Sequence, residues 1–182
     1  MNTPAIVRGA DALPRRYETV VNMLADAAAR APDAEALVCE DRRLSYRVYL
    51  RCVAGFAREL ERVGARGGRV ALILGNSLEA AIATFAVHAA GAQLVPLNPI
   101  YTARELRLIL EDAAPTVVLY EAANEAVVAP LLRALGIATA IALGPGGRRL
   151  DVWRDEAVAL PDSPAPDDLA TLQYTGGTTG RP

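Results

Sequence analysis

The chain has 182 residues, of which 52% are hydrophobic and 22% charged, and this is enough apolar material for one domain of ordinary size with a buried core. A formal net charge of −2 and an isoelectric point near 5.5 provide no basic field, so we expect neither nucleic acid nor anionic lipid as a partner. The longest apolar stretch, 78–97, contains Glu79 and His88 and is interrupted by glycine, which argues against a transmembrane segment.

The first predicted elements are an arm, a helix and a small hairpin. Residues 1–16 lack the apolar core of a signal peptide, and we expect a flexible arm there, followed by a single domain over 17–182. Helical periodicity begins at once in 17–30. Two short strands are predicted over 35–40 and 43–46, joined by a tight turn.

A second helix is predicted after the hairpin, with a signal at each end. The hydroxyl of Ser45 is placed to accept a hydrogen bond from a free amide of the first turn. Gly64 is placed to end the helix in the left-handed conformation. The apolar face of this helix consists of Val48, Cys52, Phe56, Leu60 and Val63.

From residue 69 onward, apolar strands alternate with helices. Strands are predicted over 69–74, 92–97, 116–120 and 137–143. Helices are predicted from Asn76 or Ser77 to about residue 90, and over 102–112 and 122–135. Asn76 with Glu79, and Thr102 with Glu105, have the spacing of a capping box. Strands that alternate with helices of this length imply right-handed βαβ crossovers. We therefore expect an α/β fold with a mostly parallel sheet flanked by helices on both faces.

The remaining segments are predicted to be connections and one last strand. Residues 144–147 form a turn, 150–153 a short strand, 162–168 a polar linker and 169–174 the last strand.

Few single residues suggest chemistry. Cys39 and Cys52 have neither metal-ligand spacing nor a disulfide pattern, and we expect buried thiols, in agreement with a reducing cytoplasm. His88, the sole histidine, is expected in or beside the core rather than as a catalytic base. We expect Trp153 to be a packing residue.

A loop of glycines and threonines follows the last predicted strand directly. Its members are Thr175, Gly176, Gly177, Thr178, Thr179 and Gly180. Glycine lets backbone amides approach an anion closely, and threonine hydroxyls add further donors. A nucleoside triphosphate is the ligand that this combination favours, and a loop that merely joins two strands is the alternative. The spacings GxxxxGK[ST] and GxGxxG are both absent from it.

Residues 174–182 resemble the phosphate-loop signature of the adenylate-forming (AMP-binding) superfamily, which contains acyl-CoA synthetases, luciferases and the adenylation domains of peptide synthetases. The commonest form of that signature has Ser in place of Gly176, and the Gly form after Leu172-Gln173 resembles the fatty acyl-CoA synthetase branch. Residues 96–106 (PLNPIYTAREL) are similar to a segment of long- and medium-chain fatty acyl-CoA synthetases.

Two shorter segments extend the resemblance over nearly the whole chain. Residues 44–46 (LSY) resemble the family's entry into an early helix, and 67–77 resemble its "GDRVAL…NS" stretch. The second segment departs from the family pattern because Gly68 replaces the usual Asp.

The resemblance implies an ATP-dependent acid–CoA ligase, and the cysteine usage leads us to expect it in the cytoplasm. In this family a carboxylate attacks the α-phosphate of ATP, and the thiol of CoA then displaces AMP from the acyl-adenylate. ATP, Mg²⁺ and CoA are the implied cofactors, and a fatty acid is the expected substrate. The loop 175–180 would bind the β- and γ-phosphates, with hydroxyl contacts from Thr178 and Thr179, and no catalytic residue is expected within this chain.

The resemblance also implies that further family segments would follow Pro182, among them the acyl pocket and a domain with a catalytic lysine. We therefore expect this chain to be a partial N-terminal subdomain that is inactive alone. An adenylating enzyme for an aryl or amino acid, a non-catalytic nucleotide- or phosphate-binding module, and a purely structural fragment remain as alternatives. Because the strand 169–174 would lack neighbours, we expect either a homodimer through that edge or disorder beyond about residue 165.

Overall fold

Four parallel strands form the central sheet of the computed structural model, which describes residues 15–175. They are β3 (Arg69–Ile73), β4 (Gln93–Leu97), β5 (Val117–Glu121) and β6 (Ala140–Leu143). Hydrogen bonds join them in the order β4–β3–β5–β6. The parallel pairing of β3 with β5 confirms the predicted α/β sheet.

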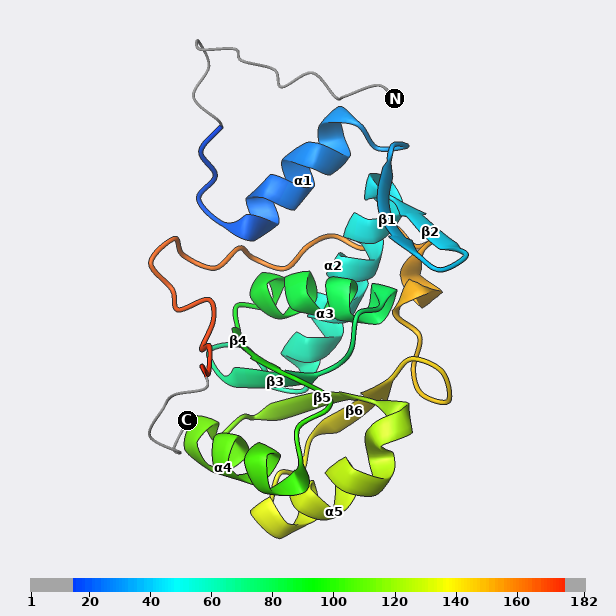
Figure 1. Ribbon diagram of the computed structural model, residues 1–182. Coiled ribbons are helices and arrows are strands. Elements are labelled where there is room, and N and C mark those ends of the chain that lie inside the picture. The colour runs from blue at the N-terminus through cyan, green and yellow to red at the C-terminus, as the bar shows by residue number, and fades with distance from the viewer. Residues whose placement is uncertain (1–14, 176–182) are drawn as a thin grey trace, which may run out of the picture.

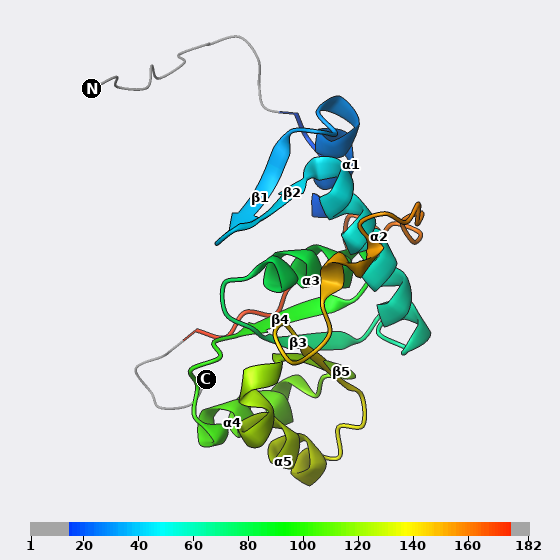
Figure 2. The ribbon, with the colours of Figure 1, turned by 90° about the vertical axis from the view of Figure 1, so that its right-hand side faces the viewer.

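The strand order explains which helices cover which face of the sheet (Figures 1 and 2). The connecting helices are α3 (Leu78–Ala89), α4 (Ala103–Ala113) and α5 (Glu125–Leu135), the last preceded by a 3₁₀ turn, η1 (Ala122–Asn124). The step from β3 to β4 and the step from β4 back past β3 to β5 run in opposite directions across the sheet. Right-handed crossovers then require α3 on one face and both α4 and α5 on the other, as observed.

The N-terminal elements thicken the α3 side of the sheet (Figure 1). They are α1 (Val20–Arg30), the antiparallel pair β1 (Glu35–Cys39) and β2 (Arg42–Ser45), and α2 (Tyr46–Arg62). The two strands form a separate hairpin, as the sequence predicts. In the core, α2 packs directly against α3.

The core consists of two clusters, one on each face of the sheet. In β3, Val70 and Leu72 belong to the cluster under α2 and α3, whereas Ala71 and Ile73 belong to the cluster under α4. Successive side chains of a strand point to opposite faces, so a strand buried on both faces must be apolar throughout. The uninterrupted apolar run of β3 has this cause.

Three of the predicted helix ends are confirmed. The hydroxyl oxygen of Ser45 accepts from the amide of Val48 at 3.4 Å, and Gly64 follows α2 with φ of 80°. At the start of α4 the Thr102 amide donates to the Glu105 carboxylate at 2.8 Å, while the Glu105 amide donates to the Thr102 hydroxyl at 3.3 Å. This is the predicted capping box.

The capping box predicted for Asn76 and Glu79 is wrong. Ser77 caps α3 instead, accepting from the amide of Ala80 at 3.1 Å. The side chain of Glu79 is buried and pairs with Arg42, so it does not reach back to the helix start.

The strand predicted over 150–153 is also wrong, because this segment is a 3₁₀ helix, η2 (Leu150–Trp153). Leu150 is fully buried, and the ring of Trp153 lies 6.0 Å from that of Phe56 in α2, which confirms its packing role. Residues three apart eclipse one another in a 3₁₀ helix, so both apolar side chains reach the same core. In a strand they would point to opposite faces.

Candidate functional site

The predicted phosphate loop lies mostly beyond the part of the chain that the structure describes. Thr175 is described and is exposed, whereas Gly176, Gly177, Thr178, Thr179 and Gly180 lie outside the described residues. The site is therefore built from the segment that leads to the loop and from the sheet edge beside it.

The strand predicted over 169–174 is reduced to a single parallel bridge with the outer edge of β4. The amide of Leu94 donates to the carbonyl of Ala170 at 2.9 Å, and the amide of Leu172 donates to the carbonyl of Leu94 at 2.9 Å. A parallel bridge fixes the direction of the segment, so the chain runs from this point toward the carboxyl end of β4. Ligands of open α/β sheets bind at the carboxyl ends of strands.

Two side chains anchor the segment beyond the bridge. Leu172 and Tyr174 pack against the cluster under α4. The hydroxyl of Tyr174 donates to the carboxylate of Asp112 in α4. Burial and this carboxylate raise the pKa of Tyr174 to about 12, so the hydroxyl keeps its proton at neutral pH and remains a donor.

Upstream of the bridge, residues 154–169 form a strap that runs beside α2 without regular secondary structure (orange in Figure 1). Three arginines donate to its backbone carbonyls. The pairs are Arg51 with Arg154 (3.2 Å), Arg58 with Ala159 (3.2 Å) and Leu160 (2.9 Å), and Arg66 with Asp162 (2.9 Å). These guanidinium groups provide the donors that a neighbouring strand would otherwise supply.

Other polar groups gather at the carboxyl ends of β3 and β5, where the strand order reverses. A short connection after β3 leads to Ser77, which caps α3, so the positive end of that helix dipole lies at this edge. Glu121 ends β5, and its Oε2 would lie 3.8 Å from a Cβ placed on Gly75. The carboxyl edge of the sheet thus offers a helix N-terminus and one carboxylate, with β4 and β3 lying between Glu121 and the segment at Thr171.

Glu79 is the one buried charged residue among those that the structure describes, with 1% of its surface exposed. Arg42 binds both of its carboxylate oxygens, at 2.9 and 3.0 Å. Arg42 also reaches Asp151 at 3.2 Å, and Arg149 binds the same carboxylate at 2.7 Å. Burial acts to raise the pKa of Asp151, but the hydrogen bond and the charges of Arg149 and Arg42 outweigh it and hold that pKa below its ordinary value.

This network of ion pairs joins the hairpin, α3 and η2. Both carboxylate oxygens of Glu79 accept hydrogen bonds from Arg42, so Glu79 has a structural role and is not free for chemistry. Sequence reasoning missed this network. The available signal was one acidic residue in the first turn of an otherwise apolar helix.

Two kinds of site are absent from residues 15–175. No three His, Cys, Asp or Glu side chains lie close enough together in this range to hold a metal ion. No helix in the same range is long and apolar enough to cross a membrane. Cys52 is buried, as expected, whereas Cys39 is only half-buried, and both are free thiols.

Comparisons with known proteins agree with this geometry. Residues 24–182 match the family described as "AMP-binding enzyme". Phosphinothricin tripeptide synthetase PhsC of Streptomyces viridochromogenes is 35% identical over 177 residues, which cover 93% of this chain and 15% of that protein. The long-chain-fatty-acid–CoA ligase of Escherichia coli is 31% identical over an alignment of 201 residues, gaps included, and the alignment covers 92% of this chain and 36% of that protein.

A solved structure gives the same relationship. ATP-bound MatB of Rhodopseudomonas palustris aligns with a TM-score of 0.75 and 32% identity, over 90% of this chain and 33% of that one. The chain therefore spans well under half the length of these relatives. Since the family match extends over most of its residues, the chain belongs to the AMP-binding enzymes, the adenylate-forming ligases.

Proposed function

We propose that residues 175–180 bind the phosphates of ATP in a protein that activates a carboxylic acid as its adenylate. The observation that supports the proposal is the parallel bridge between Thr171 and Leu94, because it sets the direction of the described chain before the loop toward the carboxyl end of β4. Residues 17–182 would then form one part of an AMP-binding domain, preceded by an arm over 1–16.

The proposed chemistry is transfer of the adenylyl group. A carboxylate oxygen attacks the α-phosphorus of ATP, the bond to the bridging oxygen breaks, and pyrophosphate leaves with the negative charge. Backbone amides of the loop and the hydroxyls of Thr178 and Thr179 would stabilise that charge by hydrogen bonds. A CoA thiol would next displace AMP and form the thioester.

The substrate that we propose is a fatty acid. It is supported by the resemblance of residues 96–106 to fatty acyl-CoA synthetases and by the match to the E. coli ligase. An amino acid is the second candidate, because the peptide synthetase PhsC matches this chain at 35% identity.

Mg²⁺ would supply charge neutralisation of the triphosphate. The described residues offer no set of side chains that could hold this ion on its own. Glu121 lies at the carboxyl end of β5, but it is a single carboxylate and does not form a metal site by itself.

The proposed function is tested by ATP–pyrophosphate exchange in the protein that contains this chain. Dodecanoate, benzoate and a set of amino acids serve as substrates, and dodecanoyl-CoA is sought with CoA present. We expect exchange with dodecanoate and a loss of about 100-fold in the Thr178→Ala variant. Thr171→Ala, whose backbone alone forms the bridge, is the matched control. Exchange with amino acids alone would assign the chain to peptide synthetases, and exchange with no acid despite ATP binding would leave a nucleotide-binding module.

The homodimer predicted through the C-terminal edge stays a prediction. Leu169 is 72% exposed next to the bridge, which leaves an apolar side chain available there. Light scattering of the chain at several concentrations tests it.

A further inference from the structure

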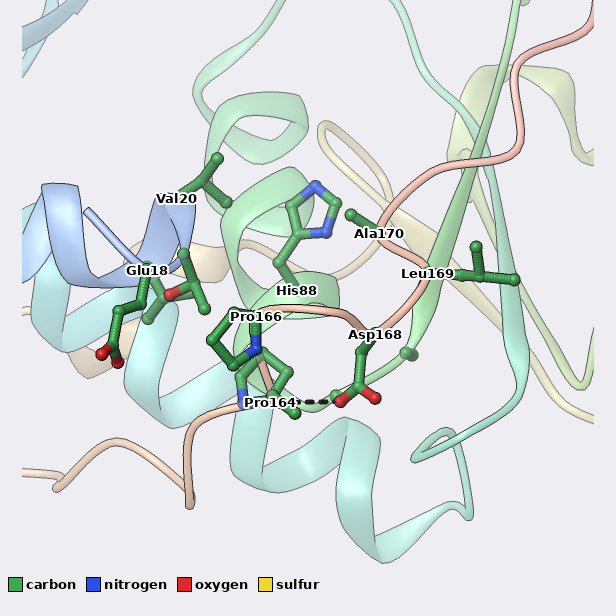
Figure 3. A pocket seen from close by; sticks show the side chains of 13 residues that line it. Glu18, Val20, His88, Pro164, Pro166, Asp168, Leu169 and Ala170 are labelled. Atoms are coloured by element: carbon green, nitrogen blue, oxygen red, sulfur yellow. Dashed lines mark hydrogen bonds between the residues drawn. The ribbon is translucent and has the colours of Figure 1, made fainter. Parts of the chain in front are cut away.

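A second candidate site lies at the bridge end of the strap, beside the residues that precede β4, whereas the chain leaves the bridge toward the carboxyl end of β4. A cavity of about 190 Å³ opens between the start of α1, the end of α3 and the strap (Figure 3). We call it the His88 cavity. Its lining includes Glu18, Val20, His88, Pro166, Asp168 and Ala170.

The volume sets the size of a ligand. A dry cavity of about 150 Å³ is known to hold benzene, and a water molecule occupies about 30 Å³ of liquid. The His88 cavity is therefore large enough for one six-membered ring with a short substituent. Its walls are mostly apolar, contributed by valine, proline, alanine and leucine side chains.

His88 supplies an unused polar group in this apolar space. Among the described residues no hydrogen bond to its imidazole is found, although every fully buried side-chain nitrogen and oxygen there has a partner. The ring nitrogens must therefore be accessible, and Figure 3 shows the ring standing between the labelled Val20 and Ala170. Burial lowers the pKa of His88, so at neutral pH the ring is uncharged and has one nitrogen that can accept a hydrogen bond.

The two charged residues that line the cavity are both acidic, and one arginine, Arg66, lies behind the wall at Gly91. Glu18 and Asp168 line the cavity, and no arginine does. One oxygen of Asp168 accepts from the amide of Ala165 at 2.8 Å, which leaves the other oxygen free (dashed line in Figure 3). An anion would be repelled, whereas a group that donates hydrogen bonds and carries positive charge would be attracted.

We propose that the His88 cavity binds a ring-sized organic ammonium ion, with the ring against the apolar walls, the ammonium group donating to His88, and the carboxylates of Glu18 and Asp168 favouring its positive charge from the rim. Benzylamine is the simplest probe of this chemistry. The proposal does not depend on the proposed function, because it concerns only residues outside the phosphate loop.

The test is titration of the 182-residue chain with benzylamine, benzyl alcohol and benzoate, followed by the NMR signals of His88. At neutral pH we expect saturable shifts with benzylamine, roughly threefold to tenfold weaker binding of benzyl alcohol, and no binding of benzoate. Equal binding of benzoate and benzylamine, or no saturable shift with any of the three, overturns the proposal.

Two pairs of variants locate the site. Ala170→Leu should fill the cavity and abolish benzylamine binding, while Thr171→Leu, one residue further and outside the lining, should not. Asp168→Asn keeps the acceptor for Ala165 but removes the charge, and should weaken benzylamine about threefold without affecting benzyl alcohol. Asp167→Asn makes the same charge change outside the lining, and an equal loss in both variants would refute a specific role of Asp168. If a variant fails to fold, the comparison of the three probes on the unaltered chain still decides.

Discussion

β3 and the segment around Thr171 flank β4 on its two sides, yet they are held there in different ways. β3 pairs with β4 from Arg69 to Ile73 and is buried on both faces. On the other side there is one bridge, at Thr171, and the strap before it is held by arginine side chains that reach its carbonyls.

This difference has an energetic consequence. Opening β3 would expose two core clusters, whereas releasing the strap costs only a few hydrogen bonds that water can replace, each worth about 1 kcal/mol. Segments with few buried apolar contacts open locally at free energies below that of global unfolding. The strap should therefore be able to leave β4 while the sheet stays folded.

The largest expected effect comes from the sheet. Leu119 in β5 is fully buried in the cluster under α2 and α3, so Leu119→Ala should lower the free energy of unfolding by about 2–5 kcal/mol. Val127→Ala on α5, where the side chain is 45% exposed, is the matched control. Urea denaturation followed by circular dichroism measures both. A loss below that of the control would mean that the sheet does not dominate stability.

The next effect concerns η2, the short helix that precedes the strap. A Cβ on Gly55 of α2 would lie 2.2 Å from the indole of Trp153, so Gly55→Ala must displace η2, at a cost of about 1–3 kcal/mol. Trp153 is the single tryptophan, and its fluorescence should shift to longer wavelength. Gly75→Ala meets no atom closer than 3.8 Å and should leave both stability and fluorescence nearly unchanged. Identical spectra for the two variants would contradict this packing.

The sheet could be predicted from the sequence, whereas the strap could not. The strands β3 to β6, the hairpin and the capping box of Thr102 follow from local periodicity and cap chemistry, and all are confirmed. The order of the strands is consistent with the handedness of crossovers, which is a property of every L-polypeptide.

The strap and the Glu79 network could not be predicted, because their partners lie far apart in the sequence. Arg58 binds carbonyls about a hundred positions away, and Glu79 binds an arginine of the hairpin. The residues around Leu169 have an apolar pattern like that of a strand, and nothing in them shows that the segment makes a single bridge instead of a full row of strand hydrogen bonds. For the candidate site, the loop 175–180 was recognised from residue types alone, and its geometry stays a prediction.

A smaller effect is expected when the strap loses one arginine. Arg58→Met keeps the apolar stem but removes donors to Ala159 and Leu160, so local opening should become easier by about 1 kcal/mol. The amide of Leu172 donates to the carbonyl of Leu94 in β4, and its hydrogen exchange should become faster. The exchange of the Val118 amide in β5 should stay unchanged.

Arg107→Met serves as the control for this measurement, because Arg107 pairs with Glu111 on the surface of α4 and does not touch the strap. If exchange at Leu172 and Val118 accelerates together, the strap opens only with the whole domain, and the contrast drawn between the two regions fails.

The smallest effect is a pH dependence at the end of the strap that adjoins the bridge. Burial lowers the pKa of His88 from its ordinary value of 6.5, so the unfolded chain binds a proton more readily than the folded one. Stability is then full above about pH 6.5 and falls as the pH is lowered toward the folded-state value. Glu18 and Asp168 line the same cavity and Arg66 lies behind Gly91 in its wall, but burial is the cause that lowers the pKa of His88.

His88→Gln should flatten this decline between about pH 7.5 and 5.5, a window above the ordinary carboxylate range. Because the chain has one histidine, no other imidazole contributes there. Urea denaturation at several pH values, in buffers without amines, measures the difference between the variant and the unaltered chain. If both lose stability in parallel, burial of His88 is not the cause, and the decline must come from carboxylates such as Asp151, whose lowered pKa makes the folded state lose stability as the pH falls further.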